Sequence, residues 1–339
     1  MRILNLMLNK NLGGLEQAFL DYDQALKSEK FDVINVTSVR AKINQSINAQ
    51  RKLMNLGLWD MISVLYLKQI INSEKPQIII SHGGRAIEFA RLATPPTILH
   101  IAVAHNQSIR RLIKCDYIIA LTMNMQDFLI QNGFPRSRIA LIPNMINIKN
   151  SFVPRNNYNQ PLVIGAMARL VQNKGIDVFI KSLLKLKEQN YNFKAILGGD
   201  GEEAEKLKAL SKELELESYI SFVGWVKDKK EFYNNIDIFC LPSLYEPFGI
   251  IVLEAMEFGV PIVCTKTQGP SEIIRDQVDG LLCTIGSSDE LAEKLAFLID
   301  NQVASKKYTQ SSYLRLQENY ETSIIAGKLA NFIKNIKPL

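Results

Sequence analysis

The feature that most constrains the fold is an alternation of short apolar runs with amphipathic stretches along the first half of the chain. Strand-like apolar runs occupy residues 2–8, 32–37, 77–81, 97–104, 117–121 and 139–142. Helical periodicity lies between several of them, for example over residues 15–27 and 123–132. Because parallel strands need a crossover connection, which is usually a helix, this alternation predicts a parallel sheet covered by helices.

The same alternation restarts after a polar interval at residues 147–160, which is the predicted linker. A length of 339 residues fits two domains. We therefore predict an α/β fold of two doubly wound parallel-sheet (Rossmann-like) domains, residues 1–155 and 156–319, that face each other across a cleft and bind ligands at the carboxyl ends of their strands. The second domain is expected to have strands at 162–167, 193–198, 220–223, 236–241 and 261–264, and helices at 175–189 and 202–214.

Composition narrows the class of protein. The chain is 47% hydrophobic, which allows both domains to bury a core. Residues 1–8 are too short for a signal peptide, and no apolar run approaches the ~20 residues of a membrane-spanning helix, so we expect a soluble cytoplasmic protein. The cysteines show no C-x-x-C spacing and are expected to be buried thiols in a reducing compartment (Cys115, Cys240, Cys264 and Cys283).

The most specific chemical signal is the stretch SLYEPFGIIVLEAMEFGVPIVCT, which carries Glu246 and Glu254 eight positions apart. Glu246 is predicted on a loop before a helix, and Glu254 inside that helix, where apolar neighbours make an idle charge costly. Between the two acids, the helix start offers free N–H groups that attract an anion (Phe248, Gly249 and Ile250). Acid, anion site and acid suit a ligand with hydroxyls at both ends and phosphates between them, such as a nucleotide-sugar.

The segment EPFGIIVLE resembles the E-P-F-G-x-x-x-x-E hallmark of the glycosyl transferase group 1 family, retaining enzymes of the GT-B fold. The resemblance implies that Glu246 binds sugar hydroxyls and that Glu254 binds the ribose hydroxyls of the nucleotide. The alternative is a helix that carries two acids without a function. The resemblance also implies that the segment after Tyr320, about residues 320–339, crosses back to the first domain.

Two cations precede the first helix of the second domain. Arg169 and Lys174 lie in a segment that resembles the family's R-L-x-x-x-K-G element, whose cations neutralise the diphosphate leaving group. Convergent cations at a strand–helix turn can stabilise negative charge that develops on a departing nucleotide. The alternative is a solvated loop with two ordinary cations.

Several glycine turns follow predicted strands. Gly13 and Gly14 open the first helix, where backbone N–H groups can approach a phosphate or an acceptor. Gly199 lies in a segment that resembles the family's G-D-G turn. A third turn resembles the segment that passes the nucleotide base, and its tryptophan is equally consistent with packing (Gly224, Trp225 and Val226).

The three histidines all lie in the first domain. The family places a histidine or an acid after a strand of this domain, near the C6 hydroxyl of the sugar, and His105 matches that position best. His82 resembles a second family position near the acceptor. His100 lies inside a predicted strand and is interpreted as structural.

The D-x-D pattern of metal-dependent transferases occurs at Asp21 and Asp23, but within a predicted helix. Side chains two positions apart on a helix face different directions, so we interpret the pair as a surface feature of the helix and expect no metal. The resemblance implies a one-face reaction in which the leaving phosphate helps to deprotonate the incoming hydroxyl. No cofactor is expected besides the donor substrate, for which a UDP-sugar is favoured.

Charge is unevenly distributed. Residues 1–150 hold 18 Lys and Arg against 10 Asp and Glu, a balance of +8. Nothing in the sequence supports nucleic-acid binding, whereas a cationic lead-in before an amphipathic helix suits an anionic membrane surface. The lead-in is formed by Arg40, Lys42, Arg51 and Lys52, and the apolar face by Leu58, Met61, Ile62 and Leu65 beside Trp59. A core-facing helix with a solvated basic start is the alternative.

Together these features predict a retaining, metal-independent glycosyltransferase of the hexosyltransferase type. It would transfer a sugar to a hydroxyl of a glycan or lipid-linked acceptor in envelope polysaccharide or lipopolysaccharide synthesis, at the inner face of the cytoplasmic membrane. A sugar-nucleotide epimerase of the same fold and a non-catalytic sugar-nucleotide-binding module remain alternatives.

Overall fold

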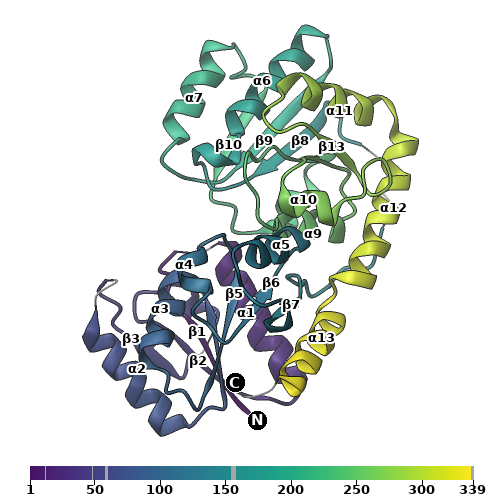
Figure 1. Cartoon of the computed structure of the whole chain (residues 1–339). Helices are drawn as coiled ribbons and strands as arrows, with labels where there is room; N and C mark the ends of the chain where they lie inside the picture. The colour runs from purple at the N-terminus through teal and green to yellow at the C-terminus, as the bar shows by residue number, and fades with distance from the viewer. Residues whose placement is uncertain (12, 48, 58–59, 154–157, 337–339) are drawn as a thin grey trace. The chain divides into compact units, whose positions relative to one another are not determined.

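The computed structural model describes residues 1–11, 13–47, 49–57, 60–153 and 158–336. The chain forms two compact units, each built on its own sheet (Figure 1). The N-terminal unit comprises Met1–Asn147 and Tyr320–Leu339, and the C-terminal unit comprises Ile148–Asn319. The boundary predicted between residues 155 and 156 lies outside the described residues.

The N-terminal unit contains a parallel sheet of seven strands in the order β3-β2-β1-β4-β5-β6-β7. The order reverses between β1 and β4, which is the mark of a doubly wound sheet. The short edge strand β3 was not predicted, because two of its three residues are exposed cations. The strands are β1 (Arg2–Met7), β2 (Asp32–Ser38), β3 (Arg51–Leu53), β4 (Ile78–His82), β5 (Leu99–Ala104), β6 (Tyr117–Ala120) and β7 (Ile139–Leu141).

Helices cover this sheet and bury the strands, which explains why the strands are apolar at successive positions. Helices α2 and α3 pack on Leu4 and Leu6 of β1, whereas Met7 contacts Phe19 of α1. The chain returns to this unit at its C-terminal end, where α13 packs against α1. The helices are α1 (Gly14–Ser28), α2 (Met61–Glu74), α3 (Gly84–Ala93), α4 (Ile109–Leu112), α5 (Met123–Gln131) and α13 (Thr322–Asn335), with short turns η1 (Lys42–Gln45) and η2 (Arg136–Arg138).

The C-terminal unit repeats this plan with six parallel strands in the order β10-β9-β8-β11-β12-β13, which reverses between β8 and β11. The strands are β8 (Leu162–Met167), β9 (Phe193–Gly198), β10 (Ile220–Gly224), β11 (Ile238–Leu241), β12 (Ile262–Thr265) and β13 (Leu281–Cys283). The prediction of two doubly wound parallel sheets is confirmed.

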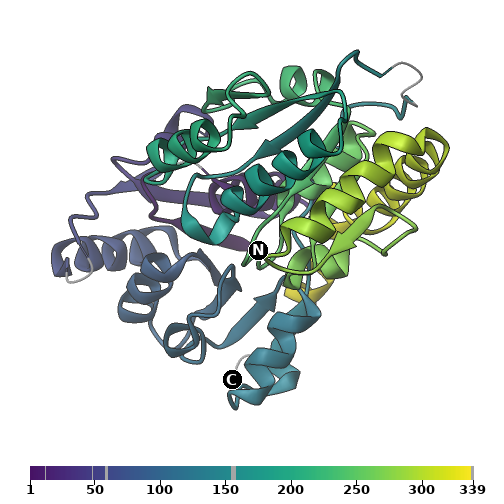
Figure 2. The same cartoon turned by 90° about the horizontal axis from the view of Figure 1, so that it is seen from above.

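The helices of the C-terminal unit are α6 (Ile176–Glu188), α7 (Ala204–Glu213), α8 (Lys229–Asn234), α9 (Ile250–Glu257), α10 (Gln268–Ile273), α11 (Ser288–Asp300) and α12 (Gln302–Asn319), with the turn η3 (Gln172–Lys174). Helices α11 and α12, coloured yellow-green, are in contact (Figure 2). All four cysteines are free and buried, as expected. Within the described residues, no helix combines the length and the hydropathy that crossing a bilayer requires.

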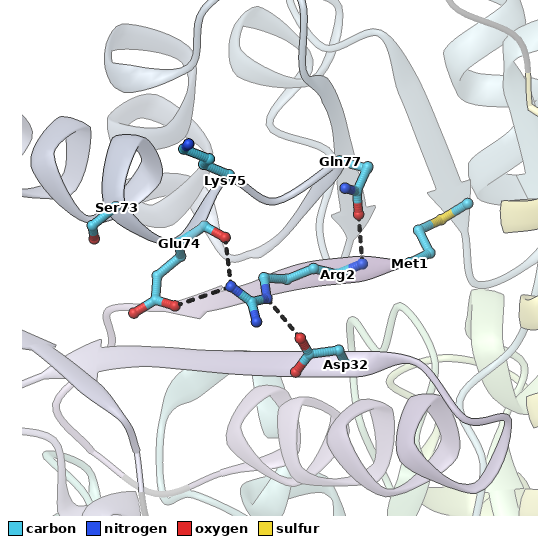
Figure 3. Close-up of a pocket in the computed structure, with 7 residues that line it drawn as sticks. All are labelled: Met1, Arg2, Asp32, Ser73, Glu74, Lys75 and Gln77. Atoms are coloured by element: carbon cyan, nitrogen blue, oxygen red, sulfur yellow. Dashed lines mark hydrogen bonds and ion pairs between the residues drawn. The ribbon is translucent and has the colours of Figure 1, made fainter.

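A hollow of about 600 Å³ opens at the amino ends of β1 and β2, at the edge of the sheet opposite the strand–helix loops (Figure 3). Its one arginine, Arg2, is already paired with Asp32 at 2.6 Å and with Glu74 at 3.6 Å. Ligands of doubly wound sheets bind at the carboxyl ends of strands, so this hollow is not the candidate site.

Candidate active site

In the C-terminal unit, the strand order reverses between β8 and β11, and the loops that follow these two strands meet through an ion pair. Lys174, in the loop after β8, places its Nζ 2.7 Å from Oε2 of Glu246, in the loop after β11. The two side chains are only 18% and 13% exposed. The structure therefore brings together two predicted catalytic residues, 72 positions apart, at the point where doubly wound sheets bind ligands.

Backbone contacts hold the two loops in register. The carbonyl oxygen of Asn173 accepts hydrogen bonds from the N–H groups of Leu244, at 2.9 Å, and Tyr245, at 3.2 Å. Gly175 caps helix α6 with φ +60°, and a Cβ there would lie 2.2 Å from the carbonyl oxygen of Pro242. Only glycine allows this approach, so the glycine after Lys174 fixes the lysine against the Glu246 loop.

Arg169 is held in a different way. It is exposed and has no ion-pair partner among the described residues. Its neighbour Ala168 donates its N–H to Gly198 at 3.0 Å, and Leu170 donates to Asp200 at 2.9 Å. A Cβ on Gly199, where φ is +134°, would lie 1.8 Å from the carbonyl oxygen of Ala168. Gly199, which is predicted to bind the donor, therefore also allows the close approach that positions the Arg169 loop.

Glu254 lies in α9 and is 7% exposed. Its Oε1 is 2.5 Å from Nζ of Lys229, and its Oε2 accepts a hydrogen bond of 3.4 Å from the hydroxyl of Tyr233. Lys229 begins helix α8, which Asp228 caps, and sequence reasoning missed it. The helix start was the available signal, since Asp228 and Glu231 have the spacing of a capping box.

Helix α9 begins at Ile250 with Gly249 as its N-cap, as the sequence predicted. The first N–H groups of a helix have no acceptor within the helix, and the first turn of α9 contains no acid that would repel an anion. The preceding loop is anchored, because the N–H of Gly269 donates to the carbonyl oxygen of Glu246 at 3.0 Å. Phe248 is 5% exposed, so its side chain belongs to the core.

The turn after β10 borders the same edge of the sheet. The carbonyl oxygen of Gly224 accepts the N–H of Gly199 at 2.7 Å, which links this turn to the Arg169 loop. Trp225 is 49% exposed, so its indole is not a core side chain. Val226 instead packs toward β9, where its Cγ2 lies 2.5 Å from the position a Cβ on Gly198 would take.

In the N-terminal unit, two glycine turns lie side by side at the carboxyl ends of β1 and β4. Gly13 caps α1 and Gly14 begins it, while Leu12 lies outside the described residues. A Cβ on Gly83, the cap of α3, would lie 3.0 Å from Cδ1 of Leu15. Glu16 places a carboxylate in the first turn of α1, which opposes binding of a phosphate and suits hydroxyl groups instead.

His105 follows β5, and its Nε2 lies 3.1 Å from Nδ1 of His82. His82 is fully buried as the last residue of β4, so it contacts His105 and not a ligand. Burial lowers the pKa of His105 to about 4 and holds the pKa of His82 well below its usual value, with the charge of His105 as the second cause. His100 is 4% exposed and bonded to Oγ of Ser81 at 2.8 Å, consistent with a structural role.

Arg111 is a second residue that sequence reasoning missed. Its Nη1 lies 2.6 Å from the position that a Cβ on Gly84 would take, at the start of α3. It stands on α4, a helix of four residues that is too short to show periodicity. Arg111 therefore brings positive charge to the same edge of the sheet as His105.

The D-x-D pair lies in α1, as predicted, but the interpretation as a surface feature is wrong for Asp21, which is 8% exposed. Gln17 donates to Asp21 at 2.8 Å, whereas Asp23 pairs with Lys27 at 2.8 Å and accepts from Asn35. The covered face of α1 reaches further round the helix than the D-x-D pattern alone indicated. Within the described residues, no group of three or more His, Cys, Asp or Glu side chains converges as a metal site.

Two family models match the chain. The model for glycosyl transferases group 1 matches residues 147–315, and the model for glycosyltransferase family 4 matches residues 12–150. Fold, site and matches together define a glycosyltransferase. The chain belongs to the glycosyl transferases group 1 family.

Known relatives agree with this class. An uncharacterized glycosyltransferase of Haemophilus influenzae is 29% identical over 336 residues, which cover 91% of this chain and 92% of that protein. The lipopolysaccharide core biosynthesis glycosyltransferase LpsE of Rhizobium meliloti is 26% identical, over 87% of this chain and 88% of its own. The fold matches that of Anabaena HepE in complex with UDP-glucose, with a TM-score of 0.87, 21% identity and coverage of 99% and 100% of the two chains.

Proposed function

We propose that this protein is a retaining glycosyltransferase that moves a sugar from a nucleotide-sugar, with UDP-glucose or a similar UDP-sugar as the first candidate donor. The ion pair between Lys174 and Glu246 carries the proposal, because it joins a phosphate-binding cation to a sugar-binding acid at a strand-order reversal. The UDP-glucose complex of the structural neighbour HepE supports the choice of nucleotide.

Each end of the donor has a matching group in this proposal. Arg169, Lys174 and the N–H groups at the start of α9 receive the diphosphate, whose charge grows as the sugar departs. Glu246 binds sugar hydroxyls. Glu254, held by Lys229, binds the ribose hydroxyls, and the turn at Gly224–Val226 passes the base.

The state of the two acids supports a one-face reaction over a two-step retaining mechanism. A two-step mechanism needs a free carboxylate nucleophile, whereas Glu246 and Glu254 are each paired with a lysine and 13% and 9% exposed. We infer a reaction on one face of the sugar, in which the leaving phosphate accepts the proton of the incoming hydroxyl. Arg169 and Lys174 supply the positive charge at the phosphate, and the proposed metal independence rests on them.

The test is a donor screen followed by product analysis. Thermal shifts with UDP-, GDP- and ADP-sugars identify the donor, and ¹H NMR of the product of a hydroxyl acceptor gives its anomeric configuration. An α-linked product from an α-configured donor is expected. An inverted product ends the retaining mechanism, a new sugar-nucleotide formed without acceptor favours the epimerase, and tight binding without turnover favours a binding module.

The acceptor side of the proposal rests on helix α2, which is apolar on both faces. Its inner face packs in the core through Val64, Leu67, Ile70 and Ile71. The outer surface, which we call the α2 surface, consists of Met54, Leu56, Met61, Ile62, Leu65 and Tyr66, which are 55%, 58%, 55%, 73%, 58% and 46% exposed. The predicted members Leu58 and Trp59 lie outside the described residues.

The α2 surface lies in the most basic part of the chain. Residues 40–115 hold 11 Lys and Arg against 3 Asp and Glu, and α2, α3 and α4 lie on one side of the N-terminal unit (Figure 1). Lys52 and Lys68 are exposed and have no ion-pair partner in the described part of the chain. The acids are engaged locally, in a helix cap or in ion pairs with arginines (Asp60, Glu74 and Glu88).

We infer that the α2 surface docks on an anionic bilayer, where a lipid-linked or envelope glycan acceptor would be met. Exposed apolar side chains beside unpaired cations fit the interface of anionic lipids, whereas neutral lipid would satisfy only the apolar part. The relative LpsE, a lipopolysaccharide core enzyme, supports an acceptor of this class.

Vesicle co-sedimentation tests the docking. Binding to phosphatidylcholine vesicles that contain phosphatidylglycerol should exceed binding to pure phosphatidylcholine and should fall with salt. Lys52→Glu and Lys68→Glu should each weaken binding about fivefold or more, on ~1 kcal/mol per cation. Ile62→Ser with Leu65→Ser should also weaken it, whereas the matched pair Val303→Ser with Leu314→Ser on α12 should not. Equal binding to both vesicles, or a dimer that the α2 substitutions dissociate, would overturn the inference.

A further inference from the structure

The contact between His82 and His105 has a consequence for the chemistry of His105. Two of the three histidines of the chain form this pair, through Nδ1 of His82 and Nε2 of His105 at 3.1 Å. Burial keeps the pKa of both rings low, so both are neutral near pH 7. A neutral imidazole carries one N–H and one lone pair, so a single proton lies between the two facing nitrogens.

Two arrangements satisfy this hydrogen bond. If His105 donates from Nε2, the proton of His82 must sit on its own Nε2, which is buried and has no hydrogen-bond partner among the described residues. If His82 donates from Nδ1, its Nε2 carries only a lone pair. An orphaned buried donor is rarer than an under-used acceptor, so the second arrangement is favoured.

Two aromatic rings pack against the imidazole of His82. The rings of Phe19 and Tyr22 stand nearly perpendicular to the imidazole, with centroids at 5.7 Å and 4.8 Å. An N–H group pointed at an aromatic ring gains a contact that is weak compared with a full hydrogen bond. The same packing holds the His82 ring in place, because it is the last residue of β4 and is fully buried.

We propose that His82 is a positioning residue that donates from Nδ1 to Nε2 of His105 and thereby fixes His105 as the tautomer with its proton on Nδ1. This inference rests on the proposed function, together with the family position that implies His105 lies near the C6 hydroxyl of the sugar. It assigns His105 a single task there. His105 donates a hydrogen bond from Nδ1 to a sugar oxygen and does not act as a base, consistent with a reaction in which the leaving phosphate takes the proton.

Nitrogen NMR of the whole protein tests the tautomer directly. With ¹⁵N-labelled histidine, the chain has only three imidazole rings to assign, and long-range ¹H–¹⁵N correlation distinguishes protonated from bare ring nitrogens. His105 should show a protonated Nδ1 and a bare Nε2 at pH 7. A protonated Nε2 on His105 would overturn the proposal, and this result requires neither a variant nor turnover.

Variants of His82 separate the hydrogen bond from the packing. His82→Phe keeps a ring but removes the donor, so His105 should move to the Nε2-protonated form and kcat should fall about tenfold, the worth of one such bond. His82→Asn keeps an amide N–H near the position of Nδ1 and should recover both the tautomer and most of kcat. Donor affinity should stay within twofold in both variants.

His100→Gln is the matched control, since it removes another buried histidine near the amino end of β5, five residues before His105, and should leave the His105 signals unchanged. An unchanged His105 tautomer in folded His82→Phe would contradict the positioning role. If kcat falls as much in His82→Asn as in His82→Phe, the hydrogen bond of His82 is not the cause, and His82 acts through packing alone. If the proposed function fails instead, the NMR result still stands and only the kinetic effects disappear.

Discussion

The two units share one topology but equip their strand ends differently. In the C-terminal unit, acids pair with lysines of other segments, as Glu246 does with Lys174 between two loops and Glu254 does with Lys229 between two helices. In the N-terminal unit, the corresponding edge holds two histidines with lowered pKa, glycine turns and the guanidinium of Arg111. Under the proposed function, the same sheet architecture receives a diphosphate in one unit and hydroxyl groups in the other.

The largest effect should come from removing the charges of the C-terminal unit. Arg169→Ala and Lys174→Ala should each cost about 2–4 kcal/mol of transition-state stabilisation, measured as kcat/KM with the identified donor. Lys181→Ala, on the outer face of α6, is the control and should change kcat/KM little, because its pair with Asp177 is exposed. Activity should persist in EDTA. A loss of activity that metal ions restore would contradict the proposal that Arg169 and Lys174 supply the positive charge at the phosphate.

Substitutions at the glycine that holds the Lys174 and Glu246 loops together should have an effect almost as large, on stability. Gly175→Ala places a Cβ 2.2 Å from a carbonyl oxygen at φ +60° and should destabilise the protein by about 2–4 kcal/mol in urea unfolding. Gly224→Ala is matched in φ, at +67°, but has no described residue within 4 Å of the added Cβ, and should cost about 1 kcal/mol. Equal costs would show that φ alone, and not the approach of the two loops, governs Gly175.

The neutral rings of the N-terminal unit predict an acid-sensitive stability. The pKa values of His100 and His105 are lowered to about 4, so the unfolded chain binds more protons between pH 6.5 and 4. Their contribution is fully present above pH 6.5 and is lost as pH falls, by up to about 2 kcal/mol each at pH 5. Urea midpoints at pH 7.5 and pH 5 measure it. His100→Gln should reduce the difference in stability between pH 7.5 and pH 5. If that difference stays the same, protonation of His100 is not its cause.

The smallest effects should separate the two acids of the C-terminal unit. Glu254→Ala should weaken nucleotide binding about tenfold, because ribose contacts are shared by ground and transition states. Glu246→Ala should mainly lower kcat, since it contacts the sugar where charge develops. Lys229→Ala should resemble Glu254→Ala in a milder form. Calorimetry with UDP decides, and an unchanged affinity in Glu254→Ala would move the ribose site elsewhere.

Sequence determined much of the fold because strand and helix patterns are local. The bounds of β8 and β9 coincide with the predicted runs. A strand of a doubly wound sheet is covered by helices on both faces, so its sequence is a continuous apolar stretch between polar turns. Likewise, the EPFG loop and the start of α9 could be predicted from glycine and proline alone. The three-residue strand β3 could not, because its charged residues form an edge that only the neighbouring strand defines.

Tertiary structure alone decided which of these groups meet. The partners Lys229 and His82 belong to helices and strands far from Glu254 and His105 in sequence, and no local pattern pairs them. Periodicity could not decide whether the apolar outer face of α2 is covered, because a helix apolar on both faces has no single core side. Helix and strand propensity depends on short segments of sequence. Contacts between strand ends depend on the order of the strands, which the whole sheet determines.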